Sequence, residues 1–401
     1  MIDNLVEQLN DPDRARRLDA LEELARMHGK GALEPPPAGE NVNNHIHTTY
    51  SFSPYTPAKA VYLAWKSGLA TAGIMDHDSV GGAEEFIEAG RIIGLPVTVG
   101  FECRCDFGGS PFEGKKLNNP DQVSVAYMAM HAIPRHMLEE AERFLAPCRE
   151  KRDVRNRKMI ENLDLKLRPY GISLDYDKDV LPLSQHASGG SVTERHLLYA
   201  LAAALTGNEL HRYFLLGAFK SQLMESFYID ASDELPHITE FVELAGRLGA
   251  IPAYAYLGDV GVSVTGDKRP QVFEDAFLEE LLVYLAASGV RAVTYMPARN
   301  TAEQLARIKT LCDINGLFQI SGEDINSPLQ GFICKKIEEP GFRHLIDSAW
   351  ALIGHESAAM GPPSSAFHAG GMFSPGTISR IPVLADRVNH FADLARASYK
   401  N

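Results

Sequence analysis

Short apolar segments of strand type alternate with amphipathic helical segments along most of this 401-residue chain. Such alternation predicts a parallel sheet covered by helices, because a strand needs a helical crossover before the next strand can run beside it in the same direction. The expected strands are residues 42–47, 70–75, 96–102, 123–131, 250–256, 292–295 and 317–321. The expected helices between them are residues 57–68, 82–94, 237–248, 271–288 and 301–315.

Side chains that can bind a metal or transfer a proton stand at the ends of the first four strands. They are His47, the neighbours Asp76 and His77, Glu102, and His131. In β/α barrels the active site lies at the carboxyl ends of the strands. The sequence therefore predicts that these residues share one functional rim.

The first strand carries two histidines one residue apart, His45 and His47. Side chains alternate along a strand, so the two imidazoles point to the same side and can bind one metal ion together. The alternative is a pair of ordinary polar residues at a strand end, because the motif is short. A second cluster of histidine and carboxylates at residues 76–78 favours the metal site.

Two segments outside the alternation indicate additional parts of the chain. Residues 4–28 predict one charged amphipathic helix, and the proline-rich residues 34–39 predict an extended linker. Residues 135–236 are charge-rich and predict an inserted helical subdomain with helices at 139–150, 152–168 and 194–205.

The C-terminal part predicts a helix at residues 342–352, a glycine- and proline-rich loop at 361–376 and a final helix at 378–399. The expected division is an N-terminal helix and linker (1–40), a β/α barrel (41–134 and 237–401) and the insert (135–236).

Composition limits the classes of partner and compartment. The net charge of −13 argues against general nucleic-acid binding, which requires a basic surface. The five cysteines follow no zinc-finger or disulfide spacing, which is typical of a reducing compartment. No apolar run has transmembrane length, and no leader segment is evident, so a soluble cytoplasmic protein without membrane binding is expected, with homo-oligomer formation left open.

The chain resembles the PHP (polymerase and histidinol phosphatase) family of metal-dependent phosphoesterases. The resemblance lies in His45-Ile46-His47-Thr48, Ile74-Met75-Asp76-His77-Asp78, Gly100-Phe101-Glu102, His131 and Ser321-Gly322-Glu323-Asp324. Residues 190–196 also resemble part of the helical insert in the family's stand-alone small-molecule phosphatases. The resemblance implies a distorted seven-stranded β/α barrel that holds up to three divalent ions at its rim.

The same resemblance implies the metal ligands. One metal would be held by His45, His47, Glu102 and Asp324, and Glu102 would bridge to a second metal held by His131. Imidazoles combined with carboxylates suit zinc, manganese or iron. The expectation is one tightly bound ion and a second, weaker one.

Three residues depart from the family pattern. Phe52, Tyr256 and Asn326 stand where the family has Asp or His, His and His, respectively. The third metal position would keep only His77, and a single imidazole cannot hold a divalent ion against water. We therefore expect the third position to be empty.

The implied reaction is hydrolysis of a small phosphorylated metabolite by metal-activated water, with His77 or Asp76 protonating the leaving oxygen. Arg299, after the strand at 292–295, could bind the substrate phosphate, although it could equally be a solvated residue at a helix start. Arg195 and His196 of the insert could face the barrel mouth or form a surface pair. The alternative function is a degenerate barrel that binds a metal or a phosphorylated ligand without turnover.

Overall fold

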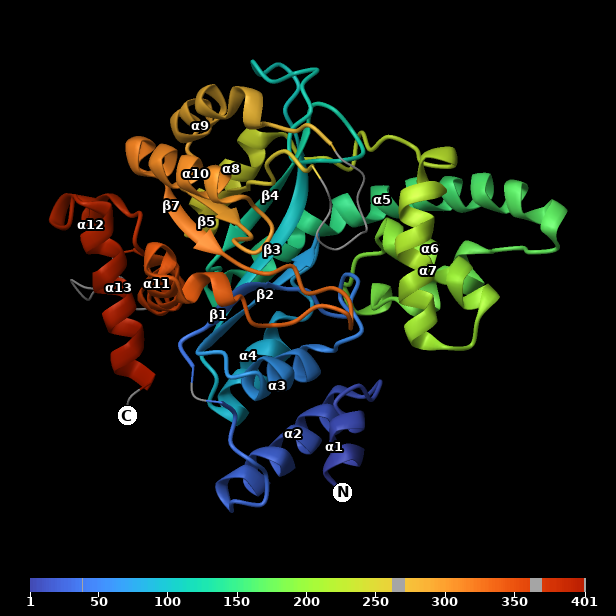
Figure 1. Cartoon of the computed structure of the whole chain (residues 1–401), viewed down its shortest axis with the longest axis horizontal. Coiled ribbons are helices and arrows are strands. Elements are labelled where there is room, and N and C mark those ends of the chain that lie inside the picture. Colours follow the sequence, from blue (N-terminus) through green and yellow to red (C-terminus); the bar gives the residue numbers. More distant parts are fainter. Residues whose placement is uncertain (38, 262–270, 361–369, 400–401) are drawn as a thin grey trace.

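The computed structural model describes residues 1–37, 39–261, 271–360 and 370–399. Its centre is one seven-stranded sheet in which the strands follow their order in the sequence. Ile46 at the end of the first strand bridges Ile325 just beyond the last, so the sheet forms a nearly closed barrel (Figure 1). The strands are β1 Val42–Ile46, β2 Thr71–His77, β3 Val97–Asp106, β4 Val125–His131, β5 Ile251–Ala255, β6 Ala292–Tyr295 and β7 Phe318–Ser321.

The sheet is mixed, and the expectation of a wholly parallel sheet is wrong. β4 runs antiparallel to both β3 and β5. Residues 107–124 connect β3 to β4 without a helix, and a direct connection of this kind returns the chain antiparallel, whereas a parallel strand needs a crossover. As a consequence, the last residue of β4 lies at the opposite end of the barrel from the last residues of its neighbours.

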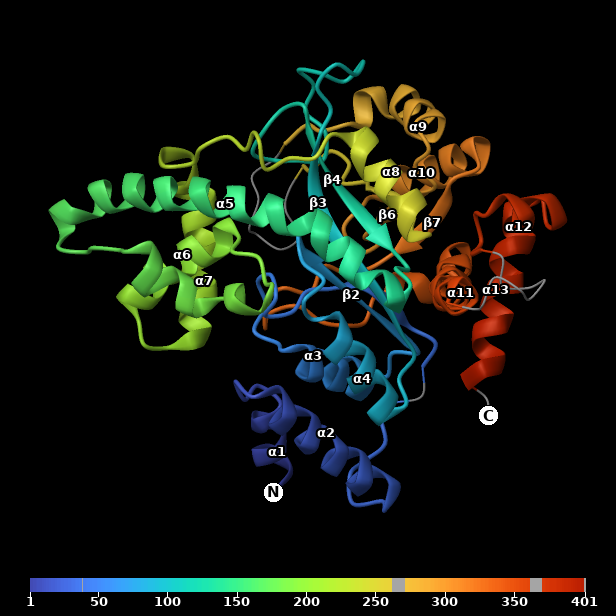
Figure 2. The same cartoon turned by 180° about the vertical axis from the view of Figure 1, so that it is seen from behind.

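Helices cover the outside of the barrel (Figures 1 and 2). Their starts agree with local capping signals: Thr56 caps α3, which has proline at its first position, and Thr301 and Gln304 form a capping box on α10. Their apolar faces pack on the strands to form the main hydrophobic core. These helices are α3 Pro57–Lys66, α4 Ala83–Ile93, α8 Ile238–Leu248, α9 Leu278–Ala287, α10 Ala302–Asn315 and α11 His344–Ala359.

The N-terminal segment forms two helices, α1 Ile2–Gln8 and α2 Arg14–Gly29, and the expected single helix is wrong. Asp13 accepts a hydrogen bond from the backbone N–H of Ala15 and starts a new helix after Pro12. The buried guanidinium of Arg17 contacts the carboxylate of Glu85 on α4 and fixes α2 to the barrel.

The insert begins with one continuous helix, α5 Leu138–Leu167, where two were expected. Its first half packs on the main core, and its second half carries Met159 and Leu163 into a separate core with α6 Glu194–Leu205 and α7 Glu209–Gln222. Figure 1 shows α5 leading away from the barrel with α6 and α7 beside it. Within the described part of the barrel, Phe52 is the one buried residue that belongs to this second core.

The C-terminal part forms α12 Pro375–Arg380 and α13 Leu384–Tyr399, not one final helix, since Pro382 separates them. α13 packs along α11 at the side of the barrel (Figure 1). Most of the loop expected at 361–376 lies outside the described residues. Among the residues that are described, no helix has both the length and the apolar character that a membrane crossing needs.

Short 3-10 segments and one π-helical segment complete the structure. The 3-10 segments are Arg135–Met137, Arg168–Tyr170, Leu181–Leu183, His186–Ser188, Met224–Ser226, Asp275–Phe277, Lys335–Glu338 and Pro340–Phe342, and the π-helical segment is Tyr176–Val180.

Candidate metal centre

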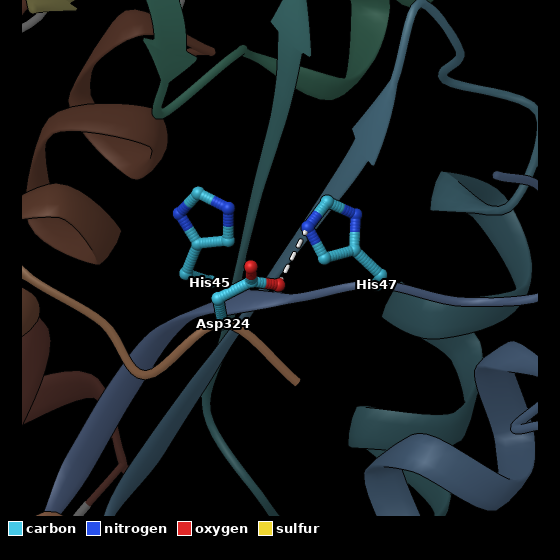
Figure 3. A group of neighbouring side chains, drawn as sticks. All are labelled: His45, His47 and Asp324. Carbon is cyan, nitrogen blue, oxygen red and sulfur yellow. Dashed lines mark ion pairs between the residues drawn. The ribbon is translucent and has the colours of Figure 1, made fainter. Parts of the chain in front are cut away.

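The two histidines of the first strand lie beside Asp324, which follows β7 (Figure 3). Backbone hydrogen bonds from His47 to Ile325 and from Ile325 to His45 hold the two segments together. Nε2 of His47 lies 3.2 Å from a carboxylate oxygen of Asp324. Ligand atoms of all three residues lie within 4.8 Å of one another, which is close enough to bind one ion.

A second group of possible ligands shares His47 and adds His77 and Glu102. His77 ends β2 and pairs with Glu102 in the register with β3, and its Nδ1 lies 3.3 Å from a carboxylate oxygen of Glu102. That same oxygen lies 3.7 Å from Nε2 of His45. The residues expected to bind the first metal, His45, His47, Glu102 and Asp324, therefore converge, and His77 joins them.

The chemistry of this group fits a divalent ion. Nε2 of His47 is buried and, apart from the contact with Asp324, has no hydrogen-bond partner among the described residues, so it is placed to bind an ion together with that carboxylate. Burial raises the pKa of Asp324, but the neighbouring His47, His45 and Arg195 outweigh burial and hold that pKa well below its usual range. A carboxylate beside imidazoles is a typical ligand set for zinc, manganese or iron.

His131 is in neither ligand group found among the described residues, and its assignment to a second metal stays a prediction. It ends the antiparallel strand β4 and pairs with Ile251, the first residue of β5. Burial and the nearby His45 lower the pKa of His131 to about 3, and its Nε2 makes no hydrogen bond in the described structure.

His77 lies at the centre of the site, but its environment does not suit the expected role of general acid. Burial, together with the charges of His47 and Arg152, lowers the pKa of His77 well below its ordinary value. At neutral pH the imidazole is therefore uncharged and can coordinate a metal.

Asp76 is not available for acid–base chemistry with a substrate. Its carboxylate is buried and accepts hydrogen bonds from the backbone N–H and the hydroxyl of Thr48 and from the hydroxyl of Ser51, each 2.6 Å long. Burial raises the pKa of Asp76, although these donors oppose the shift. The residue holds the loop after β1 instead of facing the cavity.

The three substituted positions are used for other contacts. Phe52 packs edge-on against His196 and near Tyr199 within the core of the insert. The hydroxyl of Tyr256 donates a 2.6 Å hydrogen bond to Asp275. The side-chain amide of Asn326 donates to Asp324. None of the three offers a ligand atom to the groups described above.

A cavity of about 120 Å³ opens at this end of the barrel next to His45, His77, Glu102 and Asp324. Its wall also includes three basic residues: Arg195 and Lys220 from the insert, and Arg299 from the barrel. The expected anion-binding residues Arg299 and Arg195 thus lie beside the candidate ligands, which makes the cavity suitable for an anionic molecule.

His196 does not line this cavity, contrary to the expectation that it binds substrate. Its side chain is 2% exposed, and Nδ1 accepts a 3.0 Å hydrogen bond from the backbone N–H of Thr193. This contact caps the start of α6. Burial, and next the charge of Arg152, lower the pKa of His196 to about 3.

Two residues of the cavity, Tyr127 and Lys220, were not found from the sequence. Tyr127 pairs with Arg104, two residues beyond the pair of Glu102 with Ala129, and its ring centroid lies 5.8 Å from that of His77. An antiparallel reading of β4 would have placed Tyr127 near the rim. Lys220 lies in α7 without a local motif that marks it.

Comparison with known proteins agrees with this description. No protein-family model matches the chain. A 5'-3' exoribonuclease from Haemophilus influenzae is 22% identical over 211 residues, and the match spans 52% of this chain and 66% of the length of that relative.

Two solved structures share the fold. One is a protein from Bifidobacterium adolescentis inferred to be a metal-dependent phosphoesterase, with a TM-score of 0.55 and 23% identity over 76% of this chain and 96% of the other. The second is an amidohydrolase from Chromobacterium violaceum, determined with bound sulfate and no metal, with a TM-score of 0.56 and 18% identity over 73% and 90% of the two chains. These likenesses establish the fold and agree with the resemblance to PHP proteins.

Proposed function

We propose that this protein is a PHP-type hydrolase that uses a divalent metal to cleave a phosphate ester of a small phosphorylated metabolite. The observation that carries the proposal is the composition of one cavity wall, where histidine and carboxylate ligands lie beside Arg195, Lys220 and Arg299. Metal ligands alone would fit many hydrolases, but the three basic side chains in the same wall favour a substrate with a highly charged anionic group.

The residues of the cavity divide into two sets by what they can do. His45, His47, Glu102 and Asp324 would hold the ion, with His77 as a further ligand. The bound ion would activate water and neutralise charge that develops on the phosphoryl oxygens. Arg299, Arg195 and Lys220 would orient the phosphate and neutralise its charge, because guanidinium and ammonium groups donate to its oxygens.

The names of the similar proteins support this reaction class. One solved neighbour is inferred to be a phosphoesterase, and the relative from Haemophilus influenzae is an exoribonuclease, which also cleaves phosphate esters. A substrate of nucleotide type is therefore included in the proposal. The net charge of −13 favours a small substrate or the end of a chain over binding along a nucleic acid.

One observation favours the second candidate function, binding without turnover. The Tyr256 hydroxyl is bonded to Asp275, and neither Tyr256 nor His131 belongs to the ligand groups found among the described residues, so the second metal of the family pattern has fewer ligands here. A reduced centre could bind a phosphorylated ligand without hydrolysing it.

Phosphate release distinguishes the two functions. The purified protein would be incubated with sugar phosphates, nucleotides and a 5'-phosphorylated oligoribonucleotide in the presence of manganese, zinc or iron. The proposal predicts metal-dependent turnover of at least one phosphate ester. Saturable binding of these compounds without release of phosphate would support the binding function instead.

Substitution of Arg299 should weaken substrate binding. For Arg299→Ala we expect the KM for the best phosphate ester to rise by roughly tenfold to a hundredfold, because a charge-assisted bidentate contact is lost. Arg299→Lys should recover only part of this loss, since an ammonium group keeps the charge but not the planar fork. Steady-state kinetics test both variants, and an unchanged KM for Arg299→Ala would exclude this residue from phosphate binding.

A further inference from the structure

The hydroxyl of Ser51 connects the buried carboxylate of Asp76 to the imidazole of His47. It donates a 2.6 Å hydrogen bond to Oδ1 of Asp76, and its oxygen lies 3.2 Å from Nδ1 of His47. All three side chains are almost completely buried. The contacts therefore form in the interior, where solvent does not compete with them.

The single proton of the Ser51 hydroxyl determines which ring nitrogen of His47 carries a proton. A hydroxyl group has one proton and two acceptor lone pairs. Ser51 donates its proton to Oδ1 of Asp76, and the carboxylate oxygens of Asp76 also accept from the backbone N–H and the hydroxyl of Thr48. Ser51 must then accept from His47, and this requires the neutral imidazole to carry its proton on Nδ1.

A proton on Nδ1 leaves the lone pair on Nε2 directed into the candidate metal centre. His47 belongs to both groups of possible ligands, and its Nε2 faces the carboxylate of Asp324 at 3.2 Å. Without Ser51, the neighbouring carboxylate of Asp324, 3.2 Å away, would favour a proton on Nε2 and remove that lone pair.

We propose that Asp76 and Ser51 are positioning residues that fix the tautomer and the ring orientation of His47 for metal binding. The inference rests on the proposed metal centre and adds residues that do not touch the metal. Hydrogen bonds from a ligand histidine to an outer group are a general means of orienting metal ligands. In this chain the outer group is a serine that transmits the effect of a carboxylate on the neighbouring strand.

The tautomer of His47 can be measured in the metal-free protein. Nitrogen chemical shifts and long-range proton couplings of the histidine rings distinguish the two tautomers, and the signal of His47 is identified by its loss in His47→Gln. We expect the wild-type ring to carry its proton on Nδ1. In Ser51→Ala we expect the proton to move to Nε2, because the acceptor at Nδ1 is removed and Asp324 remains.

Metal affinity provides a second readout. Ser51→Ala and Asp76→Asn should each raise the Kd for zinc by roughly tenfold to a hundredfold, the range seen when an outer contact of a ligand histidine is lost. Ser53→Ala is the matched control, since Ser53 lies in the same loop and accepts only from the backbone N–H of Tyr55 among the contacts described. It should change neither the tautomer nor the Kd.

The two readouts distinguish failure of the Asp76–Ser51–His47 hydrogen-bond chain, called the relay here, from failure of the proposed function. A wild-type His47 that carries its proton on Nε2, or a tautomer unaffected by Ser51→Ala, would overturn the relay even if the protein binds zinc. The expected tautomer and its expected change in Ser51→Ala, in a wild-type protein that binds no divalent metal, would support the relay and overturn the proposed metal-dependent function.

Discussion

Replacing His47 with alanine should remove nearly all bound metal and reduce turnover by a hundredfold or more. His47 is the one residue common to both groups of possible ligands, so its loss affects every arrangement of the centre that the described residues allow. Losing a ligand also leaves the remaining side chains poorly oriented, and loss of even an outer contact typically costs about ten- to a hundredfold. Element analysis after gel filtration and steady-state kinetics measure the two effects.

Two control variants make this result specific. His136 is an exposed histidine outside both ligand groups, and His136→Ala should keep the full metal content. Tyr256→Phe should also keep it, because the Tyr256 hydroxyl is bonded to Asp275 and not directed to a metal. Full metal content in His47→Ala would show that the assignment of the ligands is wrong.

Substitution of Glu194 should produce the largest loss of stability. Its buried carboxylate contacts Arg104 of β3 at 3.1 Å and Arg152 and Arg155 of α5 at 2.7 and 2.5 Å. Glu194→Gln keeps the shape of the side chain but leaves the three guanidiniums with less negative charge. Breaking a buried ion pair costs about 3–5 kcal/mol. We expect a loss of this order in the free energy of unfolding, measured by urea denaturation.

The pKa of Glu194 predicts how the loss of stability in Glu194→Gln should change with pH. Burial raises the pKa of Glu194, but the three arginines outweigh it and hold the pKa well below its ordinary value. A lowered pKa in the folded state contributes stability above the unfolded pKa of about 4.3 and loses it as the pH falls. The difference between wild type and Glu194→Gln should therefore be largest near neutral pH and shrink in acid.

A surface ion pair provides the matched control. Asp177 lies 2.7 Å from the guanidinium of Arg157, and both side chains are largely exposed. Asp177→Asn should change the free energy of unfolding by only about 0–1 kcal/mol. Equal effects of Glu194→Gln and Asp177→Asn would show that the buried cluster does not hold the insert against the barrel.

The sequence predicted those parts of the fold and site that depend on local patterns. Strand and helix periodicity located all seven strands, and the spacing of His45 and His47 on one strand correctly placed both imidazoles on one side. For His45 and His47 the side of the strand follows from local order alone. Arg195 and Arg299, for which the sequence left a surface position equally open, lie beside the same cavity.

The errors arise where a tertiary contact decides the outcome. The direction of β4 depends on the path of residues 107–124, which carry no signal of helix or hairpin strong enough to fix it, and this direction places His131 beside the first residue of β5 and not at the carboxyl ends of the parallel strands. Asp76 and His196 have the residue types of catalytic groups, but both are buried and hydrogen-bonded to their own loop or helix start. Only the packing of the insert shows that Phe52 contacts His196 in the core of the insert and does not face the metal centre.

The central claim, that the rim binds a metal required for phosphate ester hydrolysis, is tested most directly by removing and restoring that metal. Wild-type protein would be dialysed against a chelator, assayed for phosphate release with its best substrate, and assayed again after stepwise addition of zinc, manganese or iron with the bound metal measured at each step. We predict that activity disappears with the metal and returns as the first equivalent binds. Phosphate release that persists in fully metal-free protein, or that fails to appear with any metal while the rim is loaded, would contradict the claim.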